Sequence, residues 1–153
     1  MLSKTVRFVN LLLAGLLTGN ELGTWAAVHP ALEDLSPPER LRAEQELTRR
    51  FGAIMPAWMG SALASCLVAA LLSRGAAGFR GTLLGTLCFA AMLASTRLGN
   101  VPINARTLEL TEADIEEFER LRGRWGRLHT LRVVLTVTGF AALISGALAE
   151  GKR

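Results

Sequence analysis

The sequence predicts an all-α integral membrane protein, an antiparallel four-helix bundle with two amphipathic helical segments outside the membrane. The chain has 153 residues, of which 50% are hydrophobic and only 20% are charged, so it is too apolar for an ordinary soluble domain. Its apolar residues come in long blocks rather than in short alternating strands, which indicates helices. We expect a single membrane domain that covers residues 1–153.

Four apolar blocks are long enough to cross a bilayer, which needs about 20 mostly apolar residues and at least about 17. They cover residues 6–28, 56–73, 79–98 and 128–149. The first block can also be interpreted as a signal peptide, because basic residues precede the apolar run. Glu21 in its second half favours a membrane span, since the other spans can supply a partner for such a polar group.

The polar segment between the first two spans, residues 29–55, is predicted to form an amphipathic helix. Ser36 and Glu39 flank two prolines in the pattern of a capping box, which marks a helix start. Charged residues fill the positions between the apolar ones, so the helix leads directly into the second span. The apolar positions at roughly helical spacing are Leu41, Leu47, Phe51 and Met55.

A second amphipathic helix is predicted within residues 101–127, between the third and fourth spans. Pro102 is expected to break the helix after the third span, because the residue before a proline is pushed out of the α region. Thr111 and Asp114 form a variant capping signal for the next helix. The apolar stripe that continues into the fourth span consists of Ile115, Phe118, Leu121, Trp125 and Leu128.

The basic residues indicate orientation in a membrane rather than nucleic-acid binding. The net charge is +4, but the arginines are scattered between apolar blocks without a compact patch. The short N-terminal end carries Lys4 and Arg7, and the short turn between the second and third spans carries Arg74 and Arg80. The two long connections are nearly balanced in charge. We therefore expect a multi-pass protein of the cell (inner) membrane with both termini cytoplasmic. The expected partners are the lipid bilayer and a hydrophobic small molecule, with no nucleic acid, and formation of a homo-oligomer stays open.

Polar residues of three spans are predicted to converge at one depth. An ionisable residue inside a span costs at least about 2.5 kcal/mol, so Glu21 needs a partner or a purpose. Trp25 and His29 follow it at intervals of four and lie on roughly the same helix face. Arg97 and Asn100 end the third span on that side of the membrane. One face of the fourth span carries Trp125, His129, Arg132 and Thr136.

Two interpretations of this convergence stay open. In the first, Glu21 forms a structural ion pair with Arg132 or Arg97, and the tryptophans are interfacial belt residues. In the second, the cluster lines a pocket that opens to the outer leaflet or to the aqueous side. His29 and His129 could also hold a haem or a metal, but no HxxxH or ExxH spacing supports this, so no metal site and no cofactor are predicted. The common hydrolase, nucleotide and thiol-redox motifs do not occur either.

Three stretches carry a resemblance to a known family. They are Gly19-Asn20-Glu21 with Trp25 and His29-Pro30-Ala31-Leu32, then Asn100-Val101-Pro102-Ile103-Asn104, and finally Arg124-Trp125 with His129-Thr130-Leu131-Arg132. In order and spacing they resemble the anthrone oxygenase-like family of small four-helix membrane proteins, most of which have no known function. The chain departs from the family pattern at Phe118, where tryptophan is common, and at His129, where asparagine is frequent.

The resemblance implies a membrane oxidoreductase, a cofactor-independent and monooxygenase-like enzyme acting on a lipophilic anthrone- or phenol-like aromatic. An anthrone is a carbon acid whose enolate can react with O₂ without a redox group in the protein. The catalytic candidates, as bases or oxyanion donors, are His129, Glu21, Arg132 and Asn104. The substrate-binding candidates are Trp25, His29, Trp58, Arg97, Asn100 and Trp125. The alternatives left open are a non-catalytic ligand-binding or accessory membrane protein and a haem or metal protein that uses His29 and His129.

Overall fold

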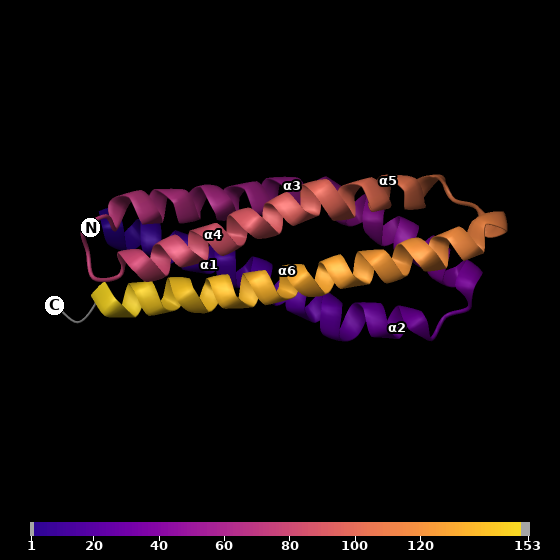
Figure 1. Cartoon of the computed structure of the whole chain (residues 1–153), viewed down its shortest axis with the longest axis horizontal. Coiled ribbons are helices and arrows are strands. Elements are labelled where there is room, and N and C mark those ends of the chain that lie inside the picture. The colour runs from indigo at the N-terminus through magenta and orange to yellow at the C-terminus, as the bar shows by residue number, and fades with distance from the viewer. Residues whose placement is uncertain (1, 151–153) are drawn as a thin grey trace.

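The computed structural model describes residues 2–150, and within this range it is helical almost throughout, with no strand. Four helical rods run up, down, up and down along one axis (Figure 1). The first rod consists of α1 (Leu2–Gly23), a π-helical turn (Thr24–Val28) and α2 (His29–Glu33), and the second rod is α3 (Pro37–Leu72). The third rod consists of α4 (Phe79–Ser95), a π-helical turn (Thr96–Asn100) and α5 (Val101–Glu109). The fourth rod consists of a 3-10 turn (Glu112–Asp114) and α6 (Ile115–Glu150). The predicted all-α four-helix bundle is confirmed.

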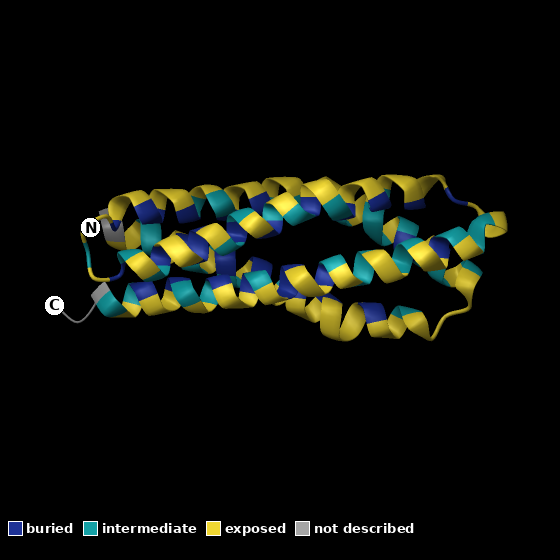
Figure 2. Ribbon diagram, viewed as in Figure 1, coloured by how far each residue is buried: buried dark blue, intermediate teal, exposed yellow. Residues whose placement is uncertain are grey.

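Each rod in the described range is long and apolar enough to cross a membrane. α3 and α6 contain 36 residues each, which at about 1.5 Å per residue corresponds to roughly 54 Å, well beyond the ~30 Å hydrocarbon core of a bilayer. Buried residues lie on the inner sides of the rods, and exposed residues, including many leucines, lie on the outer sides (Figure 2). The chain is therefore a membrane protein, and α3 and α6 are longer than the hydrocarbon core of a bilayer is thick.

Both predicted helix starts are confirmed by their caps. The Ser36 backbone N–H donates to Glu39 Oε2 over 3.2 Å, and the Ser36 side chain completes the capping box. The Thr111 backbone N–H donates to Asp114 Oδ2 over 2.9 Å, and its hydroxyl donates to the same oxygen over 2.8 Å. These contacts satisfy backbone groups that the first turn of a helix otherwise leaves without partners.

The predicted helix break at Pro102 is wrong, because the helix continues through it as α5. A five-residue π-helical turn ends at Asn100, two residues before this proline. The same arrangement occurs in the first rod, where a five-residue π-helical turn ends at Val28, two residues before Pro30. Proline lacks an N–H and crowds the preceding turn, and a wider turn accommodates both effects without ending the helix.

Two packing units hold the rods together. Around the middle and the terminal end of the bundle, a core forms from all four rods, with Leu17, Met59, Phe89, Met92 and Leu143 among its buried members. At the other end, a smaller cap core consists of Leu41, Leu110 and Phe118. Ion pairs between rods surround this cap core; Arg106, for example, makes two contacts of 2.8 and 2.9 Å with Glu117. The site described below lies between these two units.

Glycines let α4 and α6 pack closely against each other. A Cβ atom added at Gly81 would lie 2.8 Å from the Ala142 carbonyl oxygen and 2.9 Å from the backbone nitrogen of Gly146. Both neighbours are backbone atoms, which cannot move aside as a flexible side chain can. Small residues at such contacts let two membrane helices approach closely enough to pack.

We expect Gly81→Ala to lower the free energy of unfolding by about 1–3 kcal/mol, because the added methyl group overlaps the α6 backbone. Thermal or denaturant unfolding in detergent measures the effect. Gly60→Ala is the matched control, since a Cβ atom at Gly60 of α3 meets no atom within 4 Å. Equal stability of the two variants would contradict the predicted role of Gly81.

Candidate functional site

A cavity of about 320 Å³, here called the main chamber, lies between the two packing units. Apolar side chains of α3, among them Phe51, Met55 and Met59, form much of its wall. Polar groups from the other rods face them, and these include Glu21, His129 and Arg132. Small-molecule sites usually have volumes of roughly 300–1,000 Å³ and a mostly apolar lining with a few polar groups. The main chamber has these properties.

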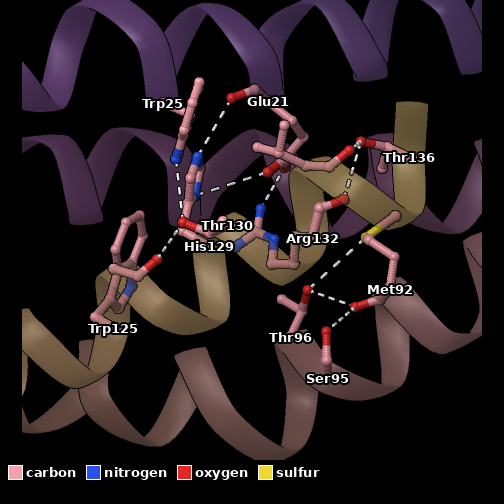
Figure 3. Close-up of polar contacts among 12 residues, drawn as sticks. Glu21, Trp25, Met92, Ser95, Thr96, Trp125, His129, Thr130, Arg132 and Thr136 are labelled. Atoms are coloured by element: carbon pink, nitrogen blue, oxygen red, sulfur yellow. Dashed lines mark hydrogen bonds and ion pairs between the residues drawn. The ribbon is translucent and has the colours of Figure 1, made fainter. Parts of the chain in front are cut away.

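Glu21 and Arg132 form a buried ion pair between the first rod and α6. Arg132 Nη2 donates to Glu21 Oε1, and the two side chains are 9% and 1% exposed, respectively (Figure 3). This decides between the two predicted partners, because Arg97 lies exposed at the chamber wall. The pair neutralises two charges that would each be costly in an apolar setting.

His129 contacts Glu21 through both of its ring nitrogens. Nε2 lies 3.3 Å from the Glu21 carbonyl oxygen, and Nδ1 lies 3.8 Å from carboxylate atom Oε2. A carbonyl oxygen only accepts hydrogen bonds, so Nε2 carries the proton of the neutral ring and Nδ1 has a free lone pair. Nδ1 has no hydrogen-bond partner among the described residues.

Three rings in mutual contact form one wall of the main chamber. Trp125 stacks on His129 with ring centroids 4.7 Å apart and planes inclined by 15°. His29 packs edge-on against both rings, with its centroid 4.7 Å from that of Trp125 and 5.3 Å from that of His129. The helix-face prediction for α6 is confirmed, since His129, Arg132 and Thr136 are all buried and Trp125 is half-buried.

Sequence reasoning missed Glu44 and Arg122, which hold His29 in place. His29 Nδ1 lies 3.2 Å from Glu44 Oε1, and Arg122 Nε lies 2.8 Å from the same oxygen. The guanidinium of Arg122 also covers the Trp125 ring at 4.8 Å. A sequence signal was available, because Glu44 is three residues after Leu41 and so lies near the apolar face of the helix. In the structure Glu44 is only 7% exposed.

A comparison with protein families finds a match over much of the chain. The family model described as anthrone oxygenase matches residues 45–142, more than half of the chain. The chain belongs to the anthrone oxygenase family. The match includes Asn104, Trp125, His129 and Arg132, whereas Glu21 lies before it. No curated protein and no solved structure matches the chain.

Other predicted site residues of this anthrone oxygenase family member also line the main chamber. Asn104 Oδ1 accepts a hydrogen bond of 2.7 Å from Trp125 Nε1, which fixes the tryptophan ring. Arg97 lies at the chamber wall and is exposed. Trp125 thus contacts Asn104, whereas His129 contacts Glu21.

Three predicted residues do not line the main chamber. Trp58 is half-buried and packs against the core between the rods. Trp25 is 44% exposed on the outer side, where its Nε1 donates to Thr130 Oγ1 over 3.1 Å. Asn100 is fully buried within its π-helical turn, and its amide has no hydrogen-bond partner among the described residues. Trp25 and Asn100 both lie within π-helical turns, where ordinary helical spacing does not determine which side of the rod a residue faces.

The two histidines touch each other rather than facing across a gap. His29 also directs Nδ1 to Glu44. Within residues 2–150, no cluster of three or more His, Cys, Asp or Glu side chains has a geometry that could hold a metal ion. In this anthrone oxygenase family member each imidazole lies next to a carboxylate, His29 next to Glu44 and His129 next to Glu21.

Proposed function

We propose that this protein is an oxygenase that oxidises the acidic methylene of a lipophilic aromatic ketone of the anthrone type. The observation that carries the proposal is the free Nδ1 lone pair of buried His129, 3.8 Å from the Glu21 carboxylate, in the wall of an apolar chamber. A general base must combine a free lone pair with reach to the substrate. Membership of the anthrone oxygenase family supports an oxygenase reaction, whereas the base at His129 belongs to this chain, because the family pattern frequently has asparagine at that position.

In the proposed reaction, His129 Nδ1 takes a proton from the methylene, and the electron pair of the broken C–H bond remains on the substrate as an enolate. The enolate is oxidised by O₂, which forms a C–O bond and a hydroperoxide after protonation. Loss of the second methylene proton and cleavage of the O–O bond leave a carbonyl group and one water molecule. The methylene carbon is thereby oxidised and O₂ is reduced, with both hydrogens leaving in the water.

Arg132 and Asn104 are the proposed donors to the enolate oxygen. Arg132 Nε is buried without a hydrogen-bond partner among the described residues, although Nη2 of the same group is bound to Glu21. Its remaining N–H can therefore point to a negative charge that develops in the chamber. Donors held in place before the reaction stabilise such a charge more strongly than water does.

The test is to supply anthrone to liposomes that contain the purified protein. We expect anthraquinone to form with equimolar uptake of O₂, at a rate above that of empty liposomes. We also propose that no bound cofactor takes part, so turnover should persist after chelation in protein without visible absorbance. Anthrone binding without turnover would instead support a non-catalytic binding protein, the second candidate.

We further propose that the protein lies in the cell (inner) membrane with both termini in the cytoplasm. Lys4 lies in the first turn of α1, and Arg74 and Arg80 lie in and just after the connection between α3 and α4, at the end of the bundle where α1 begins and α6 ends (Figure 1). Positive charge accumulates on the cytoplasmic side of membrane proteins. In a background with Cys66 and Cys88 replaced, an impermeant thiol reagent should label Glu112→Cys in intact cells. It should label Ala77→Cys only after permeabilisation. Labelling of position 77 but not 112 in intact cells would reverse the topology.

A further inference from the structure

A second cavity, of about 430 Å³ and here called the side chamber, lies on the other side of the three-ring wall. His29, Trp125 and His129 line both chambers. The remainder of the side chamber comes from the first rod and α6, without α3 or α4. These lining residues include Trp25, Pro30, Glu33, Arg122, Gly126 and Thr130. One wall of imidazole and indole rings thus separates two spaces.

The two chambers differ in the chemistry of their linings. The main chamber combines the charged groups Glu21, Glu44, Arg97 and Arg132 with a broad apolar surface from α3, which suits a lipophilic aromatic. The side chamber carries the charged groups Glu33 and Arg122, and α2 supplies part of its wall beyond the first predicted span. Glu33 and Pro30 are also exposed. Charged and exposed groups at the cap end favour water as the occupant of the side chamber.

We propose that the side chamber is the solvent port of the two imidazoles: water reaches His29 and His129 through it, while the main chamber holds the substrate. The catalytic part of this inference rests on the proposed function. A proton taken up by a wall imidazole exchanges with water in the side chamber, as one N–H bond breaks and one O–H bond forms, without electron transfer. The base thereby equilibrates with solvent while the substrate remains in the main chamber.

The orientation of His29 fits this role. Glu44 holds Nδ1, and Arg122 holds Glu44, so the ring is fixed by contacts on one side. Its other nitrogen, Nε2, is buried and has no hydrogen-bond partner among the described residues. The His29 and His129 rings are 5.3 Å apart between centroids. The pair therefore offers one free nitrogen on each ring within a wall that both chambers share.

Three glycines allow each chamber to be filled separately. Gly126 lines the side chamber, Gly52 lines the main chamber, and Gly123 is exposed and lines neither. A Cβ atom added at any of the three meets no atom within 4 Å, so leucine can be introduced without a clash at its Cβ. Leucine is also a better helix former than glycine, which protects the folding of all three variants.

The first experiment measures access of water-borne diethyl pyrocarbonate to the imidazoles in lipid nanodiscs. The chain has only two histidines, so peptide mass spectrometry follows both of them directly. We expect Gly126→Leu to slow their modification severalfold, and Gly52→Leu and Gly123→Leu to leave it near the wild-type rate. An unchanged rate in Gly126→Leu, or slowing in Gly52→Leu instead, would overturn the proposal. This readout requires no catalytic activity.

The second experiment follows deuterium incorporation from D₂O into the methylene of anthrone without O₂. We expect wild type and Gly123→Leu to accelerate this exchange above the protein-free rate. In Gly126→Leu the rate of deuterium exchange should fall severalfold relative to the rate of aerobic oxidation. Without access to D₂O, the base retains the proton that it took from the methylene and returns that same proton. An equal loss of the exchange rate and of the oxidation rate in Gly126→Leu would contradict the proposal that the side chamber is the solvent port. If wild type accelerates neither reaction, the proposed oxygenase function fails, and the modification experiment still decides whether the side chamber admits solvent.

Discussion

Replacing His129 by asparagine is expected to lower the rate of anthrone oxidation by about 10²–10⁴-fold, the usual contribution of a general base. Asparagine is polar and can donate a hydrogen bond to the Glu21 carbonyl oxygen, as His129 Nε2 does. It cannot accept a proton at neutral pH, so it removes the proposed base while keeping a polar contact. The measurement is the steady-state rate of anthraquinone formation in liposomes.

Folding and catalysis can be separated in the same experiment. His129 is buried and stacks on Trp125, so each variant is checked for its unfolding midpoint in detergent. We expect His129→Asn to bind anthrone and to unfold near the wild-type midpoint. Unchanged turnover in His129→Asn together with lost turnover in Glu21→Gln would assign the base to Glu21. A loss of turnover that follows only the loss of folded protein would indicate a structural role.

Removing one partner of the Glu21–Arg132 pair is expected to lower the free energy of unfolding by about 3–5 kcal/mol, because the other charge stays buried without compensation. The pair lies between apolar helices, where Glu21 is 1% exposed. Glu21→Gln and Arg132→Leu should each show this loss. The double variant should be less destabilised than either single variant, because no unpaired charge remains. Denaturant unfolding in detergent provides the measurement.

An exposed ion pair in the cap is the matched control. Arg50 Nε lies 2.6 Å from Glu46 Oε1, and the two side chains are 77% and 50% exposed. Arg50→Leu should therefore change the free energy of unfolding by no more than about 1 kcal/mol. Purely additive losses in Glu21→Gln, Arg132→Leu and their combination would contradict the predicted coupling.

Much of the site on α6 could be predicted because this helix is regular through the site. Trp125, His129, Arg132 and Thr136 share one face by ordinary helical spacing, and the structure confirms this. The first and third rods contain π-helical turns, which change the direction of the residues that follow them. Trp25 lies within the first of these turns and faces outward, although it is four residues after Glu21.

The sequence by itself determined the four long apolar helices, the caps at Ser36 and Thr111, and the polar face of α6. Each of these depends on residues within a few turns of one another, where helical periodicity and capping chemistry are sufficient. Only the tertiary structure decided that Arg132 rather than Arg97 pairs with Glu21, that Glu44 holds His29, and that a wall of rings divides two chambers. These features depend on the rotation and spacing of separate rods, which close packing and buried charge determine together and which no local pattern encodes.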